Sequence, residues 1–466
     1  MPEPTEALDL DPAHRKGLQR NVIRTLITSQ ILSGLGMASG LAVGALLAED
    51  LSGTESLAGL GTTFQVLGGA LIAIPVARVM AARGRRPGLQ LGLALALVGA
   101  ALVVTAAVAR SFPLLLVGML LFGGGTSANS QSRYAAADLA LPQHRGRDLS
   151  VVVWATTIGS VLGPNLVGPG QAFARALGLP ELAGSFVFSL AGFALALVVI
   201  TRLLRPDPLL TARALERADR AASAGRHTEP ARSVVTTPRT HAAENGAALE
   251  PVDGVGPGEL GDGNEDHDGS LTRGLRVVRS NGRARLGVLT IALGHVVMVS
   301  VMVMTPIHMS HGHADLQVIG FVISVHILGM FAFSPIIGAA VDRWGGPIIA
   351  ATGGAVLTLA SVLASQSMTG WSPLLLIALL LLGVGWSCTL ISGSTMLTSA
   401  VTAEERPATQ GLSEVFMGLA GAGGGLLAGV VVDRLGYGTL AMGAAVVGVA
   451  VVVMVAVTAP RRPTTS

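Results

Sequence analysis

The sequence predicts an all-α membrane protein with twelve transmembrane helices in two pseudo-symmetric bundles of six. Half of the 466 residues are apolar and only 13% are charged, about half the charged share of an ordinary soluble domain. No Asp, Glu, Lys or Arg occurs between Pro347 and Ala403. Such a run fits two membrane spans joined by a short turn. The chain also contains six apolar segments long enough to span a membrane, then a polar gap, and then six more such segments.

Each expected span is a nearly uncharged segment of about 20 residues, the length that crosses a bilayer. The first six lie at 22–48, 56–80, 89–109, 113–139, 149–169 and 183–204. The second six lie at 285–306, 316–341, 347–366, 373–400, 408–432 and 438–459. The domains that follow are a tail at 1–21, an N-terminal bundle at 22–204, a linker at 205–283, a C-terminal bundle at 284–459 and a tail at 460–466.

The polar gap is expected to be a solvated and largely disordered linker. It opens with Arg205-Pro206-Asp207-Pro208 and has almost no large apolar residues. Residues 209–222 could form a short helix, whereas 250–270 have the composition of a disordered segment. An acidic run at 261–268 could bind a cation weakly, but a plain linker is the favoured interpretation.

The positions of Lys and Arg predict the orientation, because these residues accumulate in short cytoplasmic loops. With the N-terminus inside, the inside loops hold Arg78, Arg83, Arg85, Arg86, Arg145, Arg147, Arg343, Arg406, Arg461 and Arg462, and the outside loops hold Arg110, Arg175 and Arg434. We therefore expect a multi-pass protein of a bacterial cytoplasmic membrane, with both termini and the linker in the cytoplasm.

Two motifs resemble those of the major facilitator superfamily. The loop Gly338-Ala-Ala-Val-Asp342-Arg343-Trp-Gly345 is similar to the family's G-x-x-x-D-R-x-G. In the equivalent loop of the first half, Ala81 and Ala82 replace Asp and Arg. The fifth span holds Gly159-x-x-x-Gly163-Pro164, similar to a motif commonest in drug/proton antiporters.

The resemblance covers nearly the whole chain outside the tails and the linker. It implies a secondary transporter that works by alternating access, with two bundles rocking about a midplane site. The gating residues that it implies are Asp342, Arg343, Arg85, Arg86, Gly163 and Pro164.

Methionine and histidine cluster in the seventh and eighth spans. His295, Met298 and Met302 are spaced by three and four residues, which places them on one helix face. His326 and Met330 share a face in the same way. We expect the two faces at similar depth, in the outer half of the membrane.

The outside loop between these spans is expected to capture metal through exposed side chains: His308, Met309, His311 and His313. Thioethers are soft ligands that favour Cu(I), and imidazole also suits copper. A site of Met298, Met302, His326 and Met330, with His295, could therefore hold Cu(I) and release it. The alternative for the methionines is ordinary core packing, for which Met is well suited.

The same four positions resemble the CcoA-like copper importers, a branch with M-x-x-x-M in the seventh span and H-x-x-x-M in the eighth. The resemblance implies Cu(I) import, with copper as cargo and no permanently bound cofactor. Two alternatives stay open. One is a proton-coupled carrier or exporter of a drug-like compound or riboflavin, and the other is a copper sensor that does not transport. Metal uptake measured against dye efflux separates the copper importer from the organic carrier, and copper binding without flux would indicate the sensor.

Further polar groups lie inside the expected spans. Glu414 in the eleventh span is suited to carry a proton, because ionisable groups inside a membrane are functional by default. Arg133 in the fourth span could pair with Asp138 or with a neighbouring helix. Asn129 and Gln65 could line the cavity.

The composition excludes other classes. No Walker-type phosphate loop occurs, so ATP does not drive transport, and no nucleophile–base pattern indicates an enzyme. The single cysteine, Cys388, excludes a disulfide framework. The basic residues lie in loops rather than on a face with aromatics, so nucleic acid is not expected. The expected partners are the cargo, the lipid bilayer and a cytoplasmic copper chaperone, and the protein is expected to be monomeric.

Overall fold

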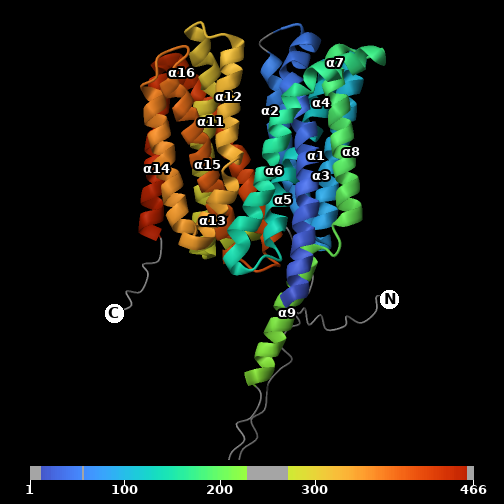
Figure 1. Ribbon diagram of the computed structural model, residues 1–466, viewed down its shortest axis with the longest axis vertical. Coiled ribbons are helices and arrows are strands. Elements are labelled where there is room, and N and C mark those ends of the chain that lie inside the picture. Colours follow the sequence, from blue (N-terminus) through green and yellow to red (C-terminus); the bar gives the residue numbers. More distant parts are fainter. Residues whose placement is uncertain (1–11, 55–56, 228–270, 459–466) are drawn as a thin grey trace, which may run out of the picture.

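A computed structural model describes residues 12–54, 57–227 and 271–458, and these residues form helices and no strand. The helices assemble into two bundles that stand side by side (Figure 1). The first bundle consists of α1 (Pro12–Ser52), α2 (Ala58–Arg83), α3 (Arg85–Ala109), α4 (Phe112–Phe122), α5 (Gly124–Ala137), α6 (Arg145–Asn165), α7 (Val167–Ala176) and α8 (Gly184–Leu203). The second consists of α11 (Gly282–His311), α12 (Leu316–Phe331), α13 (Ser334–Trp344), α14 (Gly346–Ser365), α15 (Pro373–Ala400) and α16 (Arg406–Thr458).

The helices match the expected membrane spans. Within the described residues, ten helical stretches are long and apolar enough to cross a membrane, and eleven if α6 and α7 count as one bent span. The 53-residue α16 contains a non-helical residue, Gly436, with φ 82° and ψ 165°. Because this residue separates two helices, α16 covers both the eleventh and the twelfth expected span. The two-bundle helical fold is therefore confirmed.

Three expected spans are interrupted. The fourth is divided at Gly123 into α4 and α5, and the eighth at residues 332–333 into α12 and α13. The fifth ends at Asn165, after which α7 bends away by 58°. Hydropathy alone does not reveal such breaks, because an apolar helix and an apolar bend have the same composition.

Each bundle has its own core. Phe122 lies at the centre of the first, with its ring edge-on to Phe186 and Phe193 at centroid distances of 5.7 and 5.2 Å. The second core gathers around Leu382 and Trp386 of α15. Many large apolar side chains remain exposed on the outer faces, such as Leu426 and Val457 at 75% and 78%. Exposed apolar surface on this scale suits contact with lipid rather than water.

The linker contains a helix at each end, and the first of these covers the short helix expected at 209–222. It contains α9 (Pro208–His227) and α10 (Leu271–Ser280). Leu209 of α9 is fully buried in the first core, and Val278 of α10 packs in a smaller apolar cluster of the second bundle with Leu397 and Leu412. These few apolar contacts hold α9 and α10 against the bundles, and α9 also makes ion pairs with Glu404 and Arg406. Residues 228–270, with the acidic run 261–268, lie outside the described residues, as do most of the two tails.

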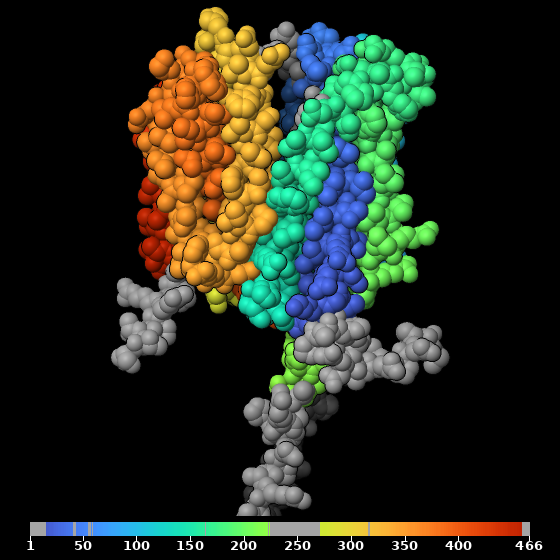
Figure 2. Space-filling view, viewed as in Figure 1, coloured from blue at the N-terminus to red at the C-terminus, as the bar shows by residue number. Residues whose placement is uncertain are grey.

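The bundles meet at one end of the molecule and separate at the other. A shared apolar cluster joins Leu149 and Val153 of α6 to Ile337 and Val341 of α13. We call the end that carries α9 and the tip of α13 the linker-side end. At the opposite end the surface is hollowed between α12 and the helices of the first bundle (Figure 2). The structure is therefore closed at the linker-side end and has a cleft at the other.

Candidate functional site

A buried ion pair joins the two bundles. Arg133 of α5 donates from Nη2 to Oε1 of Glu414 of α16 at 2.5 Å. The two side chains are only 7% and 6% exposed, and the Arg133 guanidinium also lies 4.7 Å from the centre of the Tyr134 ring. The two partners expected for Arg133 are Asp138 and a neighbouring helix, and in the structure the partner lies on the neighbouring helix α16. The fold thus places Arg133 against Glu414, the residue expected to carry a proton.

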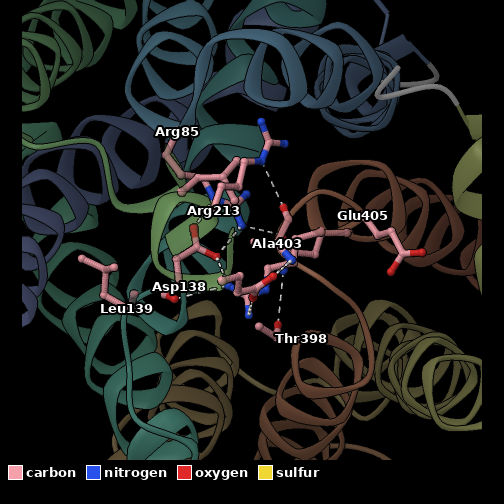
Figure 3. A network of polar contacts seen from close by, with 12 residues as sticks. Arg85, Asp138, Leu139, Arg213, Thr398, Ala403 and Glu405 are labelled. Atoms are coloured by element: carbon pink, nitrogen blue, oxygen red, sulfur yellow. Dashed lines mark hydrogen bonds and ion pairs between the residues drawn. The ribbon is translucent and has the colours of Figure 1, made fainter. Parts of the chain in front are cut away.

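A second buried network lies closer to the linker-side end, around Asp138 (Figure 3). Arg85 donates from Nε to Asp138 at 2.7 Å, and Arg406 of α16 reaches the same carboxylate at 3.3 Å. All three side chains are at most 2% exposed. Arg85 also donates to Gln131 at 3.1 Å and across the bundle interface to Gln410 at 2.6 Å.

This network changes the interpretation of the positively charged loop after α2. Arg85 does not lie in a solvated loop, because it is the first residue of α3 and is wholly buried. Gly84 precedes it with a φ of 94°, a value that favours glycine. The turn directs Arg85 inward, where Asp138 compensates its charge. The structure thus places Arg85 at a contact between the bundles, where its gating role stays a prediction.

The motif at the tip of α13 makes a further contact between the bundles. Asp342 accepts hydrogen bonds from the backbone N–H groups of Gly146 and Arg147 at 2.7 and 2.8 Å. These groups begin α6, where unpaired N–H groups and the helix dipole favour a negative charge. Arg343 makes no such contact and is exposed, with its guanidinium 5.9 Å from the ring of Trp344.

The fifth-span glycines pack α6 against α1. A Cβ on Gly159 would lie 2.6 Å from the backbone of Gly34, and one on Gly163 would overlap Ala38. The helices therefore approach more closely than any side chain would permit. The motif serves close packing in this structure, and its gating role remains a prediction. Pro164 follows Gly163 just before the helix ends at Asn165.

Polar side chains of the first bundle have unused hydrogen-bonding atoms. Asn129 accepts from Ser33 at 2.7 Å, but its amide nitrogen has no partner among the described residues. The Oε1 atoms of Gln65 and Gln30 are likewise buried and unpaired. Such atoms are costly unless water or a ligand satisfies them. The expected role of Asn129 and Gln65 in lining the cavity stays a prediction.

Aromatic side chains of the second bundle gather around His295. Trp386 donates from Nε1 to Nδ1 of His295 at 3.0 Å. The Trp386 ring also lies edge-on to Phe331, with centroids 5.8 Å apart. Nε2 of His295 faces Gly421 of α16. His295 thus accepts a hydrogen bond through Nδ1, and its role as a metal ligand beside Met298 stays a prediction.

The expected Met/His residues lie on two helices that are held apart. Both α11 and α12 pack on α15, and they have little contact with each other. Nδ1 of His326 donates to the backbone carbonyl of Leu379 on α15 at 2.8 Å, whereas its Nε2 is buried without a partner. Met298 is buried in the second core, and Met302 and Met330 are partly buried. Met298, Met302 and Met330 thus belong to one apolar cluster of the second bundle, and their role as copper ligands with His326 stays a prediction.

The expected metal-capture loop is helical over half its length, which corrects its description as exposed. His308 and Met309 belong to α11, which runs past Pro306 to His311. Met309 is fully buried, and His308 stacks on the ring of Tyr437 at 4.1 Å. His311 and His313 are exposed. Among the described residues no group of three or more His, Cys, Asp or Glu side chains could hold a metal ion.

Comparison with known proteins agrees with this architecture. The sequence model of the Major Facilitator Superfamily matches residues 26–313 and 286–466. The chain belongs to this superfamily.

Two similar relatives are uncharacterized superfamily transporters of Bacillus subtilis. YdeG is 35% identical over 92% of this chain and 90% of its own length, and YddS is 33% identical over 95% and 92%. The riboflavin transporter RfnT of Brucella anthropi is 28% identical over 84% of this chain and 85% of its own length.

Solved structures show the same fold. The proton:xylose symporter XylE matches with a TM-score of 0.67 at 14% identity, over 96% of this chain and 97% of its own. The human organic anion transporter MFSD10 matches with a TM-score of 0.65 at 19% identity, over 94% and 99%. This superfamily member is therefore a multi-pass secondary transporter and belongs to a family of carriers rather than enzymes.

Sequence reasoning missed several residues of this transporter's bundle interface. Asp138 was considered only as a partner of Arg133, and Arg406 only as a loop charge. Arg213 and Glu216 of α9 were not considered at all. Their signal was the spacing of three residues, which places both on one face of a helix together with buried Leu209 and Ala212.

Proposed function

We propose that this transporter is a proton-coupled carrier of a small organic solute, bound between the bundles at the base of the cleft. The observation that carries the proposal is the buried pair of Arg133 and Glu414, which spans the bundle interface. Protonation of Glu414 would remove its attraction for Arg133 and free the guanidinium to hold a polar group of the solute. One proton would thus change both the contact between the bundles and the binding site.

The surrounding side chains support an aromatic and polar solute. Trp386 and Phe331 offer ring surfaces, which favour stacked or edge-on contacts with a planar ligand. The unpaired amide atoms of Asn129 and Gln65 offer hydrogen bonds. The likeness to a riboflavin transporter supports a heterocycle of this kind.

The test is uptake of radiolabelled riboflavin, and of a drug-like fluorescent dye, into proteoliposomes with an imposed proton gradient. We expect accumulation of at least one compound by the wild type. Glu414→Gln should abolish gradient-driven accumulation but keep exchange of the compound across the membrane. Trp386→Ala should weaken binding, whereas Trp371→Ala is the matched control because Trp371 is 49% exposed. No accumulation of either compound, or full accumulation by Glu414→Gln, would contradict the proposal.

A second candidate function is Cu(I) import through Met298, Met302, His326 and Met330. It is favoured by the unpaired and buried Nε2 atom of His326. Met298, Met302 and Met330 pack in one apolar cluster of the second bundle. Because Leu keeps nearly the volume of Met but cannot bind copper, a Met298→Leu/Met302→Leu variant should lose copper uptake at limiting copper. Wild-type copper uptake by that variant would eliminate this candidate.

We also propose that the linker-side end faces the cytoplasm of a bacterium, across its inner membrane. The distribution of Lys and Arg supports this orientation. Labelling of single cysteines in intact cells tests it. A cysteine at exposed Arg343 should be protected from an impermeant reagent, and one at exposed His313 should react. The opposite pattern would invert the topology.

A further inference from the structure

The helix α9 is anchored to the first bundle. Asp207, which precedes it, accepts from the backbone N–H groups of Leu209 and Leu210 at the start of α9 at 3.0 and 3.2 Å. The other oxygen of the same carboxylate accepts from the N–H of Arg86 at 2.7 Å. Leu209 is buried in the first core. One side chain therefore caps α9 and ties it to the start of α3.

From this anchored position α9 reaches the second bundle. Arg213 is 3% exposed and donates to the carbonyl of Ala81 at 2.8 Å and to the carbonyl of Ala403 at 3.4 Å. Glu216 accepts from the N–H of Ala403 at 3.1 Å. The Ala403 peptide, in the connection from α15 to α16, is thus held at both its N–H and its C=O by one helix (Figure 3).

Additional charges of α9 extend the contact. Glu216 lies 3.6 Å from Arg406 at the start of α16. Arg220 lies 3.3 Å from Glu404. Both pairs join the linker helix to the same short connection, so α9 contacts the second bundle through side-chain charges as well as through backbone groups.

The contact of α9 lies at a position where the two halves of the molecule differ. The second half has a carboxylate at this position, and the first half does not. Gly345 and Gly84 have the same backbone turn, with φ of 93° and 94°, and each donates its N–H to the carbonyl four residues earlier. Three residues before Gly345, Asp342 holds the start of α6 in the opposite bundle. Three residues before Gly84 stands Ala81, which cannot accept a hydrogen bond through its side chain. Arg213 binds the Ala81 carbonyl at this position.

We propose that α9 makes, at Ala81 in the first half of the molecule, a closing contact equivalent to the one that Asp342 makes in the second half. Arg213 and Glu216 are positioning residues that hold the start of α16 against the first bundle. They must release Ala403 for the linker-side end to open. Alternating access requires the bundles to part at this end. Because α9 is anchored to the first bundle, the contact that must break is the one with the second. Arg213 and Glu216 therefore help to set the balance between the two states of the transport cycle.

The test measures opening of the linker-side end directly. Cys388 is replaced by Ser, and Ala77, which is 1% exposed and abuts Gly411 of α16, is replaced by Cys as a reporter. The rate of maleimide labelling then reports how often this interface opens. Loss of the charge from one such hydrogen bond should favour the open state by about tenfold. We expect Arg213→Gln and Glu216→Gln, which keep a hydrogen-bonding group but lose the charge, each to raise the labelling rate by about that factor, while Arg213→Lys, which keeps the positive charge, should give a smaller rise.

The matched control is Arg217→Ala on the same helix. Arg217 is 63% exposed and lies 3.9 Å from Glu404, and such surface pairs contribute little. Its labelling rate should equal that of the reporter alone. If the Arg213→Gln variant does not reach the membrane, the labelling rate of the Glu216→Gln variant tests the proposal, since Gln keeps the side-chain volume of Glu. Labelling of Glu216→Gln at the control rate would overturn the proposal, and so would a rise of the same size in Arg217→Ala.

Discussion

Two buried arginines have different environments at the bundle interface. Arg133 has one carboxylate partner, Glu414, whereas Arg85 shares Asp138 with Arg406. A buried charge without a partner is strongly destabilising, but a pair replaced as a unit is often neutral. The Arg133–Glu414 pair can therefore separate only if one partner is neutralised, which suits coupling to a proton.

We predict that removing one partner of this pair destabilises the protein more than removing both. Glu414→Gln alone should lower the free energy of unfolding by about 3 kcal/mol, because it leaves Arg133 buried and unpaired. The double variant Arg133→Gln/Glu414→Gln should recover most of this loss. Thermal unfolding of the purified protein in detergent measures the effect. Equal stability of the single and double variants would show that the pair is not coupled.

At the scale of helices, the contacts between elements depend on glycine and on helix ends. Gly159 allows α6 and α1 to meet along their backbones. Asp342 joins α13 to α6 through the first N–H groups of α6. The first contact involves helices of one bundle, and the second involves both bundles. Substitution at the first should therefore affect stability, and substitution at the second should affect the transport cycle.

We predict that Gly159→Ala is destabilising by about 1–3 kcal/mol, the usual cost of overpacking. The added methyl group would lie within 2.6 Å of the Gly34 backbone, so α6 must shift away from α1. Gly168→Ala is the control, because a Cβ there meets no atom within 4 Å. The melting temperatures of the two purified variants give the comparison. A Gly159→Ala protein as stable as Gly168→Ala would mean that the two helices separate without cost.

We predict that Asp342→Asn slows transport without abolishing solute binding. Asn keeps one acceptor oxygen but loses the charge that interacts with the start of α6, a contact of about 0.5–2 kcal/mol. The closed linker-side end should therefore become less favoured. The initial rate of uptake and the dissociation constant of the solute should be measured on the same preparation. Loss of binding together with rate would place Asp342 in the binding site instead.

For the whole molecule, the linker contains two helices that pack against the bundles. Residues 208–227 form α9, which contacts both bundles, and 271–280 form α10, which packs on α16. Residues 228–270, which join these two helices, lie outside the described residues. Replacement of α9 and replacement of residues 228–270 are therefore separate experiments.

We predict that replacing residues 228–270 by a Gly/Ser-rich segment of equal length leaves transport near normal, because a flexible tether of that length imposes little constraint. Replacing 208–227 in the same way should instead open the linker-side end and impair transport. Uptake, normalised to protein in the membrane, is the measurement. Loss of uptake in the first variant would assign a function to the tether, and normal uptake in the second would remove α9 from the cycle.

The sequence by itself determined the two-bundle helical fold, because hydropathy and length decide which segments can lie in lipid. It also identified Glu414, Arg133 and Asp342 as functional candidates, since charges inside or beside spans are costly and therefore informative.

The tertiary structure decided which partners these residues have. The partner of Arg133 lies 281 positions away along the chain, and no local pattern encodes such a contact. Tertiary packing also placed both α11 and α12 against α15, with little contact between them, and turned His308 and Met309 inward. A helix-face pattern specifies the direction of a side chain relative to its own axis. The rotation of a helix about its axis, relative to its neighbours, depends on the packing of the whole bundle. Which neighbouring residues each helix face contacts is therefore known only from the fold.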